Sequence, residues 1–122
     1  MVKLIIEEPE SAALVRYLTG DHVLATSRIA EVEVSRATAL ANPSPEVGEE
    51  VNALLASCLL VSVSVQLLRS ARRLATATVR TLDAVHLASA LRIEADELLA
   101  YDRRLLAAAS DHGIVCASPG QG

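Results

Sequence analysis

Hydrophobic residues along this chain recur at helical spacing in some stretches and at strand spacing in others, and the two kinds of stretch alternate. Apolar positions three and four residues apart predict helices, and short apolar or alternating runs predict strands. The predicted helices cover 1–7 (the end of a helix), 9–19, 28–41, 46–57, 66–77, 81–95 and 102–112. The predicted strands cover 22–26, 59–65, 98–101 and 114–117.

Capping and turn residues support several of these boundaries. Ser27 is expected to cap the helix that starts at residue 28, and Gly113 to end the helix before it. The Asn-Pro-Ser-Pro sequence at 42–45 predicts a break between two helices, because proline excludes helical backbone before it. Residues 59–65 alternate in polarity at period two, which is typical of a half-buried strand.

The alternation of strands and helices predicts an α/β fold. A mainly parallel sheet is expected, flanked by helices on both faces in a three-layer sandwich. We expect a single domain over residues 1–117 and a flexible tail over 118–122. The run 51–68 contains no charged residue, but polar side chains interrupt it, so no membrane-spanning helix is expected.

Composition narrows the possible functions. Aromatic residues make up only 2% of the chain, so base stacking on an aromatic platform is not expected. Cys58 and Cys116 lack metal-ligand spacing, and nothing resembles a signal peptide, which together indicate a reducing cytoplasm. A net charge of −4 argues against a broad basic face for nucleic acid. Ten of the eleven basic residues are Arg, which suits phosphate contacts but is equally explained by GC-rich coding.

Three acidic residues occupy positions that suggest a site. Asp102 directly follows the predicted strand 98–101, and ligands of parallel sheets bind beyond the carboxyl ends of the strands. Asp83 begins a helix between the core candidates Leu82 and Val85. Glu33 lies roughly 40° around its helix from Ile29, on the apolar face, where an unpaired charge would be costly. If these carboxylates converge, their repulsion calls for a hard cation such as Mg²⁺ or Mn²⁺.

Each of these residues also has a purely structural explanation. Asp102 alone is expected more often as a helix N-cap, and Asp83 alone as a charge that favours the helix dipole. Glu33 alone could pair with Arg28 or Arg36. Taken singly, the three acids are a weak indication of chemistry.

Four stretches of the sequence resemble the VapC family of PIN-domain ribonuclease toxins. Residues 2–11 are similar to the segment that follows the family's first motif. Residues 27–37, with Glu33, are similar to the second acidic motif, and 82–91 to the third, which is the most specific match. Residues 99–105 resemble the fourth. The motifs appear in the family's order and spacing along the whole chain.

The resemblance implies a PIN-like fold and an Mg²⁺- or Mn²⁺-dependent endoribonuclease. It places Glu33, Asp83 and Asp102 as metal-site and catalytic carboxylates. It offers Arg36 and the pair Arg103–Arg104 as residues that contact RNA or an antitoxin. The implied partners are RNA and a cognate VapB-type antitoxin, and the implied assembly is a homodimer without membrane association.

The sequence departs from the family pattern in two places. The family's first strand, which ends in an aspartate, has no counterpart in these 122 residues. The implied strand order 3-2-1-4-5 makes that strand central, so we expect the sheet to close up or another chain to fill the gap. In the fourth motif, Ala100 stands where a hydroxyl residue is frequent, which removes a possible hydrogen bond behind a metal ligand.

Two functions from different classes remain. The first is an active ribonuclease toxin, and the second is a catalytically impaired PIN domain that only binds its antitoxin. A receiver-type phosphoryl-transfer domain is excluded, because it needs a late lysine and the only lysine is Lys3.

Overall fold

The computed structural model describes residues 8–20 and 22–121, and these divide into two compact units. Unit 1 contains residues up to Leu60 together with 119–121, and unit 2 contains Val61–Ser118. The helix predicted over 1–7 lies outside the described residues. The described elements, in chain order, are α1 (Ser11–Tyr17), β1 (Ala25–Ser27), α2 (Ala30–Ala41), α3 (Pro45–Ala56), β2 (Leu59–Val61), α4 (Val65–Leu74), α5 (Thr81–Arg92), β3 (Leu98–Leu99), α6 (Arg103–Asp111) and β4 (Cys116–Ala117).

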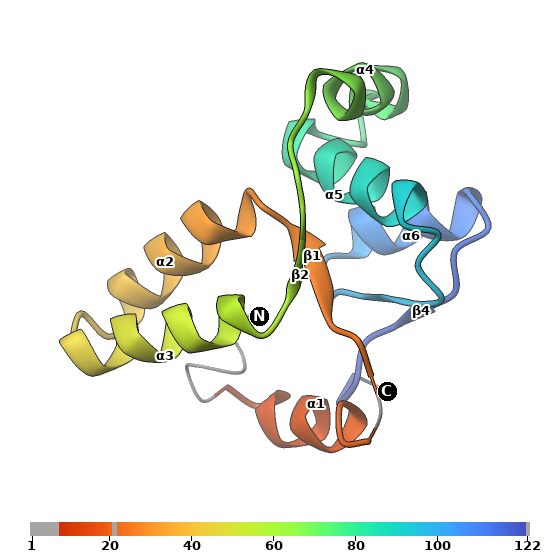
Figure 1. Cartoon of the computed structure of the whole chain (residues 1–122). Helices are drawn as coiled ribbons and strands as arrows, with labels where there is room; N and C mark the ends of the chain where they lie inside the picture. Colours follow the sequence, from red (N-terminus) through yellow and green to blue (C-terminus); the bar gives the residue numbers. More distant parts are fainter. Residues whose placement is uncertain (1–7, 21, 122) are drawn as a thin grey trace. The chain divides into compact units, whose positions relative to one another are not determined.

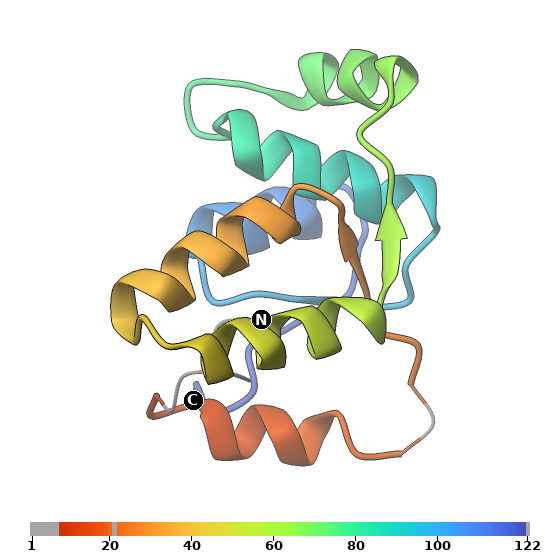
Figure 2. The ribbon, with the colours of Figure 1, turned by 60° about the vertical axis from the view of Figure 1, so that its left-hand side comes forward.

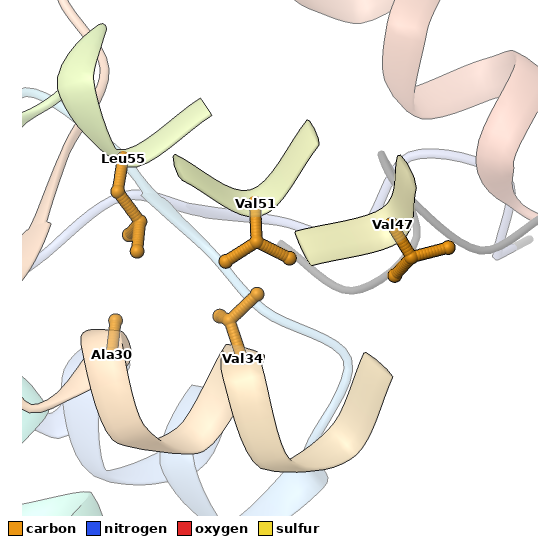
Figure 3. Close-up of a cluster of buried hydrophobic side chains, with 5 residues drawn as sticks. All are labelled: Ala30, Val34, Val47, Val51 and Leu55. Atoms are coloured by element: carbon orange, nitrogen blue, oxygen red, sulfur yellow. The ribbon is translucent and has the colours of Figure 1, made fainter. Parts of the chain in front are cut away.

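The core of unit 1 lies between α2 and α3, which run side by side (Figure 1). The break predicted at 42–45 is confirmed, because Pro45 is the first residue of α3 and the Ser44 hydroxyl accepts a hydrogen bond from the Val47 N–H at 3.2 Å. Side chains from the two helices then meet in a buried apolar cluster (Figure 3), and Leu60 packs against it. Its buried members are Ala30, Val34, Val47, Val51 and Leu55.

The last described residues pack against α1 within unit 1. The Gln121 side chain donates a hydrogen bond to the Glu10 carboxylate at 3.4 Å. Gly120 has a φ of +91°, and a Cβ there would lie 3.1 Å from the Ala13 Cβ, so a side chain would be strained and crowded. The domain boundaries and the flexibility expected of residues 118–122 stay predictions.

Unit 2 is built on a pair of helices, α4 and α5, with α6 packed on α5. Leu67 and Ala71 are the buried residues of α4, and Leu87 of α5 is fully buried. β3 and β4 pair in parallel, with Leu98 opposite Cys116 and Leu99 opposite Ala117. α5 and α6 begin at the same end of the unit, as both views show (Figures 1 and 2).

The strands are shorter than the sequence pattern indicated. The strand predicted over 59–65 ends at Val61, because the Ser64 hydroxyl accepts from the Leu67 N–H at 3.1 Å and starts α4. Ser27 does not cap α2: it is the last residue of β1, and its hydroxyl accepts from the Ile29 N–H at 3.3 Å. The Ser27 and Ser64 hydroxyls therefore accept hydrogen bonds from backbone N–H groups two or three residues further along the chain, and these local bonds set where the strands and helices begin or end.

The α/β class predicted from the alternation is confirmed, with helices between short paired strands. The strands form two two-stranded sheets, β1 with β2 and β3 with β4. Counted after the family's first strand, they correspond to strands 2 and 3 and to strands 4 and 5 of the implied order, so each pair consists of neighbours. The uncharged run 51–68 is divided among α3, β2 and α4. Among the described residues, no helix has the length and apolar character needed to cross a bilayer.

Candidate functional site

Asp102 is the N-cap of α6. Its backbone is extended, with φ −79° and ψ 119°, and one carboxylate oxygen, Oδ1, accepts hydrogen bonds from two backbone N–H groups. The bond from Arg104 is 2.8 Å long and that from Leu105 is 3.4 Å. The side chain is exposed, and no hydrogen bond to its second oxygen, Oδ2, occurs among the described residues. The cap therefore fixes the carboxylate at the helix start and leaves one oxygen available to a ligand.

The capping role of Asp102 can be separated from a role in chemistry. Asp102→Ala is expected to lower the free energy of unfolding by about 1 kcal/mol, because two N–H groups lose their acceptor. Asp102→Asn is expected to change stability by only a few tenths of that value, because asparagine caps as well as aspartate does. Urea unfolding followed by circular dichroism measures both. Equal stability of the Ala variant and the wild type would show that the cap contributes nothing.

Asp83 lies in the first turn of α5 and is half-buried. Its Oδ2 accepts from the Arg80 N–H at 3.4 Å, so the side chain turns back toward the start of its helix. Val85 is buried as the sequence predicted, but the core position predicted for Leu82 is wrong, because 44% of that residue is exposed. Val85 and Ala84 anchor this end of α5 and hold Asp83 at its position.

Asp83 and Asp102 therefore both lie at helix N-termini, at the same end of unit 2 (Figures 1 and 2). The N-terminus of a helix carries unsatisfied N–H groups and the positive end of the helix dipole, which favours carboxylates and other anions there. Asp102 also stands three residues after β3, beyond the carboxyl end of a parallel strand, as predicted. The structural explanations of the two aspartates, helix capping by Asp102 and a favourable charge at the helix N-terminus for Asp83, both hold. Neither explanation excludes a ligand.

Glu33 and Arg36 belong to α2 in unit 1. Glu33 is half-buried and Arg36 is exposed. Arg28, one of the two arginines expected as a partner for Glu33, pairs with Glu31 at 3.0 Å. Glu31 is exposed. The metal-binding role of Glu33 stays a prediction.

The two carboxylates of unit 2 suit a hard divalent cation. Mg²⁺ is typically bound through one or two carboxylates, with water and substrate phosphates as its other ligands. Among residues 8–20 and 22–121, no group of three Asp, Glu, His or Cys side chains is gathered closely enough to hold a metal. Asp83 and Asp102 offer the carboxylate oxygens that Mg²⁺ or Mn²⁺ prefers as ligands.

The cysteines do not provide a nucleophile. Both are free thiols and half-buried. Burial raises the pKa of the Cys58 thiol, and burial together with the charge of Glu97 raises the pKa of the Cys116 thiol. A raised pKa keeps a thiol protonated near neutral pH, and the protonated form is a poor nucleophile.

One group of charged residues was missed by the sequence reasoning. Arg69, Arg72, Arg73 and Arg80 are all exposed, on α4 and just before α5. Residues 61–92 hold five arginines and one acid, so a local count of charge would have found this region. The net charge of the whole chain concealed it. The candidate arginines Arg103 and Arg104 are also exposed, on the first turn of α6.

Comparison with known proteins places these features in a family. The family model for the PIN domain matches residues 1–111. No solved structure matches the chain.

Relatives within that family carry the name VapC. The chain is 38% identical over 121 residues to Ribonuclease VapC46 of Mycobacterium tuberculosis (strain ATCC 25618 / H37Rv), covering 98% of this chain and 92% of the relative. It is 35% identical over 126 residues to Ribonuclease VapC47 of Mycobacterium tuberculosis (strain CDC 1551 / Oshkosh), with the same coverage. The chain therefore belongs to the PIN-domain family, in its VapC branch.

Proposed function

We propose that this protein is a metal-dependent endoribonuclease toxin that cleaves phosphodiester bonds in RNA. The observation that carries the proposal is the position of Asp83, in the first turn of α5, and Asp102, the N-cap of α6, at one end of unit 2. The relatives' name, ribonuclease, supports the reaction class. The substrate phosphate is anionic, and two helix N-termini favour an anion or a cation-bound phosphate at this end.

The carboxylates are proposed as the groups that hold the cation. Asp102 has an Oδ2 that accepts no hydrogen bond among the described residues, beside a capped Oδ1, and Asp83 is held in place by the buried Ala84 and Val85 that follow it in α5. Glu33 is proposed as a third carboxylate because its motif resembles the family's second acidic motif. When bound, Mg²⁺ or Mn²⁺ supplies a Lewis acid that polarises phosphoryl oxygens and activates water for in-line attack.

The arginines of the motifs are proposed as contacts for phosphate or for an antitoxin. Arg103 and Arg104 are exposed on the first turn of α6, next to the Asp102 carboxylate. Guanidinium groups make planar, two-pronged contacts with phosphate or carboxylate oxygens. Arg36, exposed on α2, is proposed in the same role.

The biological context is proposed from the family. We infer a toxin–antitoxin pair in which a VapB-type antitoxin silences the enzyme, a homodimeric assembly, and a cytoplasmic location without membrane association. Free thiols at Cys58 and Cys116 agree with a reducing compartment. Exposed apolar residues on α2, Val32 at 68% and Leu40 at 70%, suit a helix that a partner chain covers.

The test is an RNA cleavage assay on the purified chain with its metal removed and restored. Cleavage is expected in the presence of Mg²⁺ or Mn²⁺, because the carboxylates alone cannot neutralise the phosphate. It is expected to stop when EDTA is added and to return when the cation is added in excess. Cleavage that continues unchanged in EDTA would contradict the metal dependence. No cleavage with either cation, beside tight binding of a VapB-type antitoxin, would favour the impaired, antitoxin-binding form.

A further inference from the structure

The strongest local charge in this protein lies on the α4–α5 helix pair and is positive. Residues 61–92 carry five arginines and a single acid, Asp83, whereas the rest of the chain has fourteen acidic and six basic residues. An acidic protein that concentrates positive charge on one helix pair attracts polyanions to that pair and repels them elsewhere.

Three of these arginines share the solvent face of α4. At about 100° per residue, Arg69, Arg72 and Arg73 lie roughly 140° to 240° around the axis from Leu67, the most buried residue of the helix. Leu67 and Ala71 face inward, and α4 packs on α5. The guanidinium groups are therefore held on the outer side of a helix whose other side is fixed in the core.

The loop that follows α4 connects these arginines to the start of α5, where Asp83 lies. Residues 75–80 connect α4 to α5 and are tightened at Thr76, whose N–H donates to the Val79 carbonyl and whose hydroxyl accepts from the Val79 N–H, both at 3.0 Å. Arg80 follows as the N-cap of α5, and its N–H donates to Asp83. The arginines of the last turn of α4 and Arg80 thus lie at the end of the helix pair that holds Asp83.

Helix stability does not account for this arrangement. Arg72 and Arg73 in the last turn of α4 do favour its dipole, but Arg69 is mid-helix. Arg80 stands at the N-terminus of α5, where a cation is unfavourable. Among the described residues, none of the four arginines pairs with a carboxylate, so their charge is available to a ligand.

We propose that Arg69, Arg72, Arg73 and Arg80 form a basic track that binds the phosphate backbone of the RNA substrate and leads it to Asp83. The proposal rests on the proposed ribonuclease function and names the surface that holds its substrate. Arginine favours phosphate through its planar fork of donors. Because aromatic residues make up only 2% of the chain, RNA binding to the track depends on the charge of the phosphates and not on base stacking. The binding is therefore expected to vary little with RNA sequence.

The salt dependence of RNA binding tests the track. The full chain is titrated against a short labelled single-stranded RNA in EDTA, so that binding is measured without cleavage, over a range of salt concentrations. Removing one phosphate contact lowers the slope of log K against log salt by about 0.7 for single strands, so Arg72→Gln/Arg73→Gln should lower it by about 1.4. If wild type and variant converge near about 1 M salt, affinity at about 0.1 M should fall roughly 25-fold.

Two matched variants distinguish the effect of the charges in the basic track from the effects of misfolding and of a change in net charge elsewhere. Arg72→Lys/Arg73→Lys keeps both charges and should retain the wild-type salt slope. Arg16→Gln/Arg92→Gln removes two exposed arginines outside the track, since Arg16 lies in unit 1 and Arg92 ends α5 at the end opposite Asp83, and should leave slope and affinity unchanged.

Several outcomes would overturn the proposal. If wild type cleaves RNA but Arg72→Gln/Arg73→Gln keeps its slope, the track is wrong and the ribonuclease function stands. If that variant binds RNA normally but loses antitoxin binding or self-association, the surface is a protein interface instead. If wild type neither binds nor cleaves RNA, the proposed function fails together with the track.

Discussion

Replacing Asp83 by asparagine is expected to lower metal-dependent RNA cleavage by more than about 100-fold. Mutations behind a metal ligand already cost 10- to 100-fold, and loss of a ligand should exceed that. Asparagine keeps the size of the side chain and an oxygen that can accept from the Arg80 N–H, so the start of α5 should be preserved. What disappears is the negative charge that a divalent cation requires. Initial rates of RNA cleavage at saturating Mg²⁺ measure the effect.

The matched control for this substitution is Asp111→Asn. Asp111 is an exposed acid at the last residue of α6, the opposite end of that helix from Asp102. Its replacement changes net charge by the same amount and is expected to leave cleavage unchanged. Full activity in Asp83→Asn would remove this residue from the site, and equal losses in both variants would attribute the effect to overall charge.

Leu87→Ala is expected to have the largest effect on stability. Leu87 has no exposed surface and lies in α5, which packs against both α4 and α6. Truncating a fully buried leucine removes its apolar contacts and leaves a cavity, at a cost of about 2 to 5 kcal/mol. Domains are commonly stable by only about 5 to 15 kcal/mol, so a large share of the stability would be lost. Urea unfolding followed by circular dichroism gives the value.

Leu91→Ala serves as the control on the same helix. Leu91 is 38% exposed, so its truncation is expected to cost roughly 1 kcal/mol or less. A similar loss in both variants would show that burial along α5 does not decide stability. A loss in Leu87→Ala below about 1 kcal/mol would contradict the tight packing of unit 2.

The sequence predicted several of the described helices well because their ends have a local cause. Pro45 and Ser44 begin α3, Asp102 begins α6, and Gly113, with φ +77°, follows its end. The strands were predicted less accurately, since their lengths depend on pairing with distant partners. Alternating polarity suggested a strand up to Val65, but the cap formed by Ser64 starts a helix at Val65, and residues 62–64 form the connection between β2 and that helix.

The candidate site was predictable where local position sets it. Asp102 after a strand and Asp83 at a helix start follow from the order of elements, and both occur as expected. The exposure of Leu82 was not predictable. Helical periodicity identifies the apolar face of a helix but does not determine which residues at the edge of that face are buried. The basic track was hidden for a different reason: net charge sums over a chain, whereas a ligand responds to the charge near it.

Mn²⁺ binding to the wild type and to Asp83→Asn and Asp102→Asn, followed by electron paramagnetic resonance of the free ion, is the most direct test of the two-carboxylate site. Asparagine at 102 retains the helix cap, so any change in binding reports on charge and not on folding. The wild type should bind Mn²⁺, both variants should bind it at least about tenfold more weakly, and Asp111→Asn should match the wild type. Wild-type affinity in both Asp83→Asn and Asp102→Asn would contradict the site.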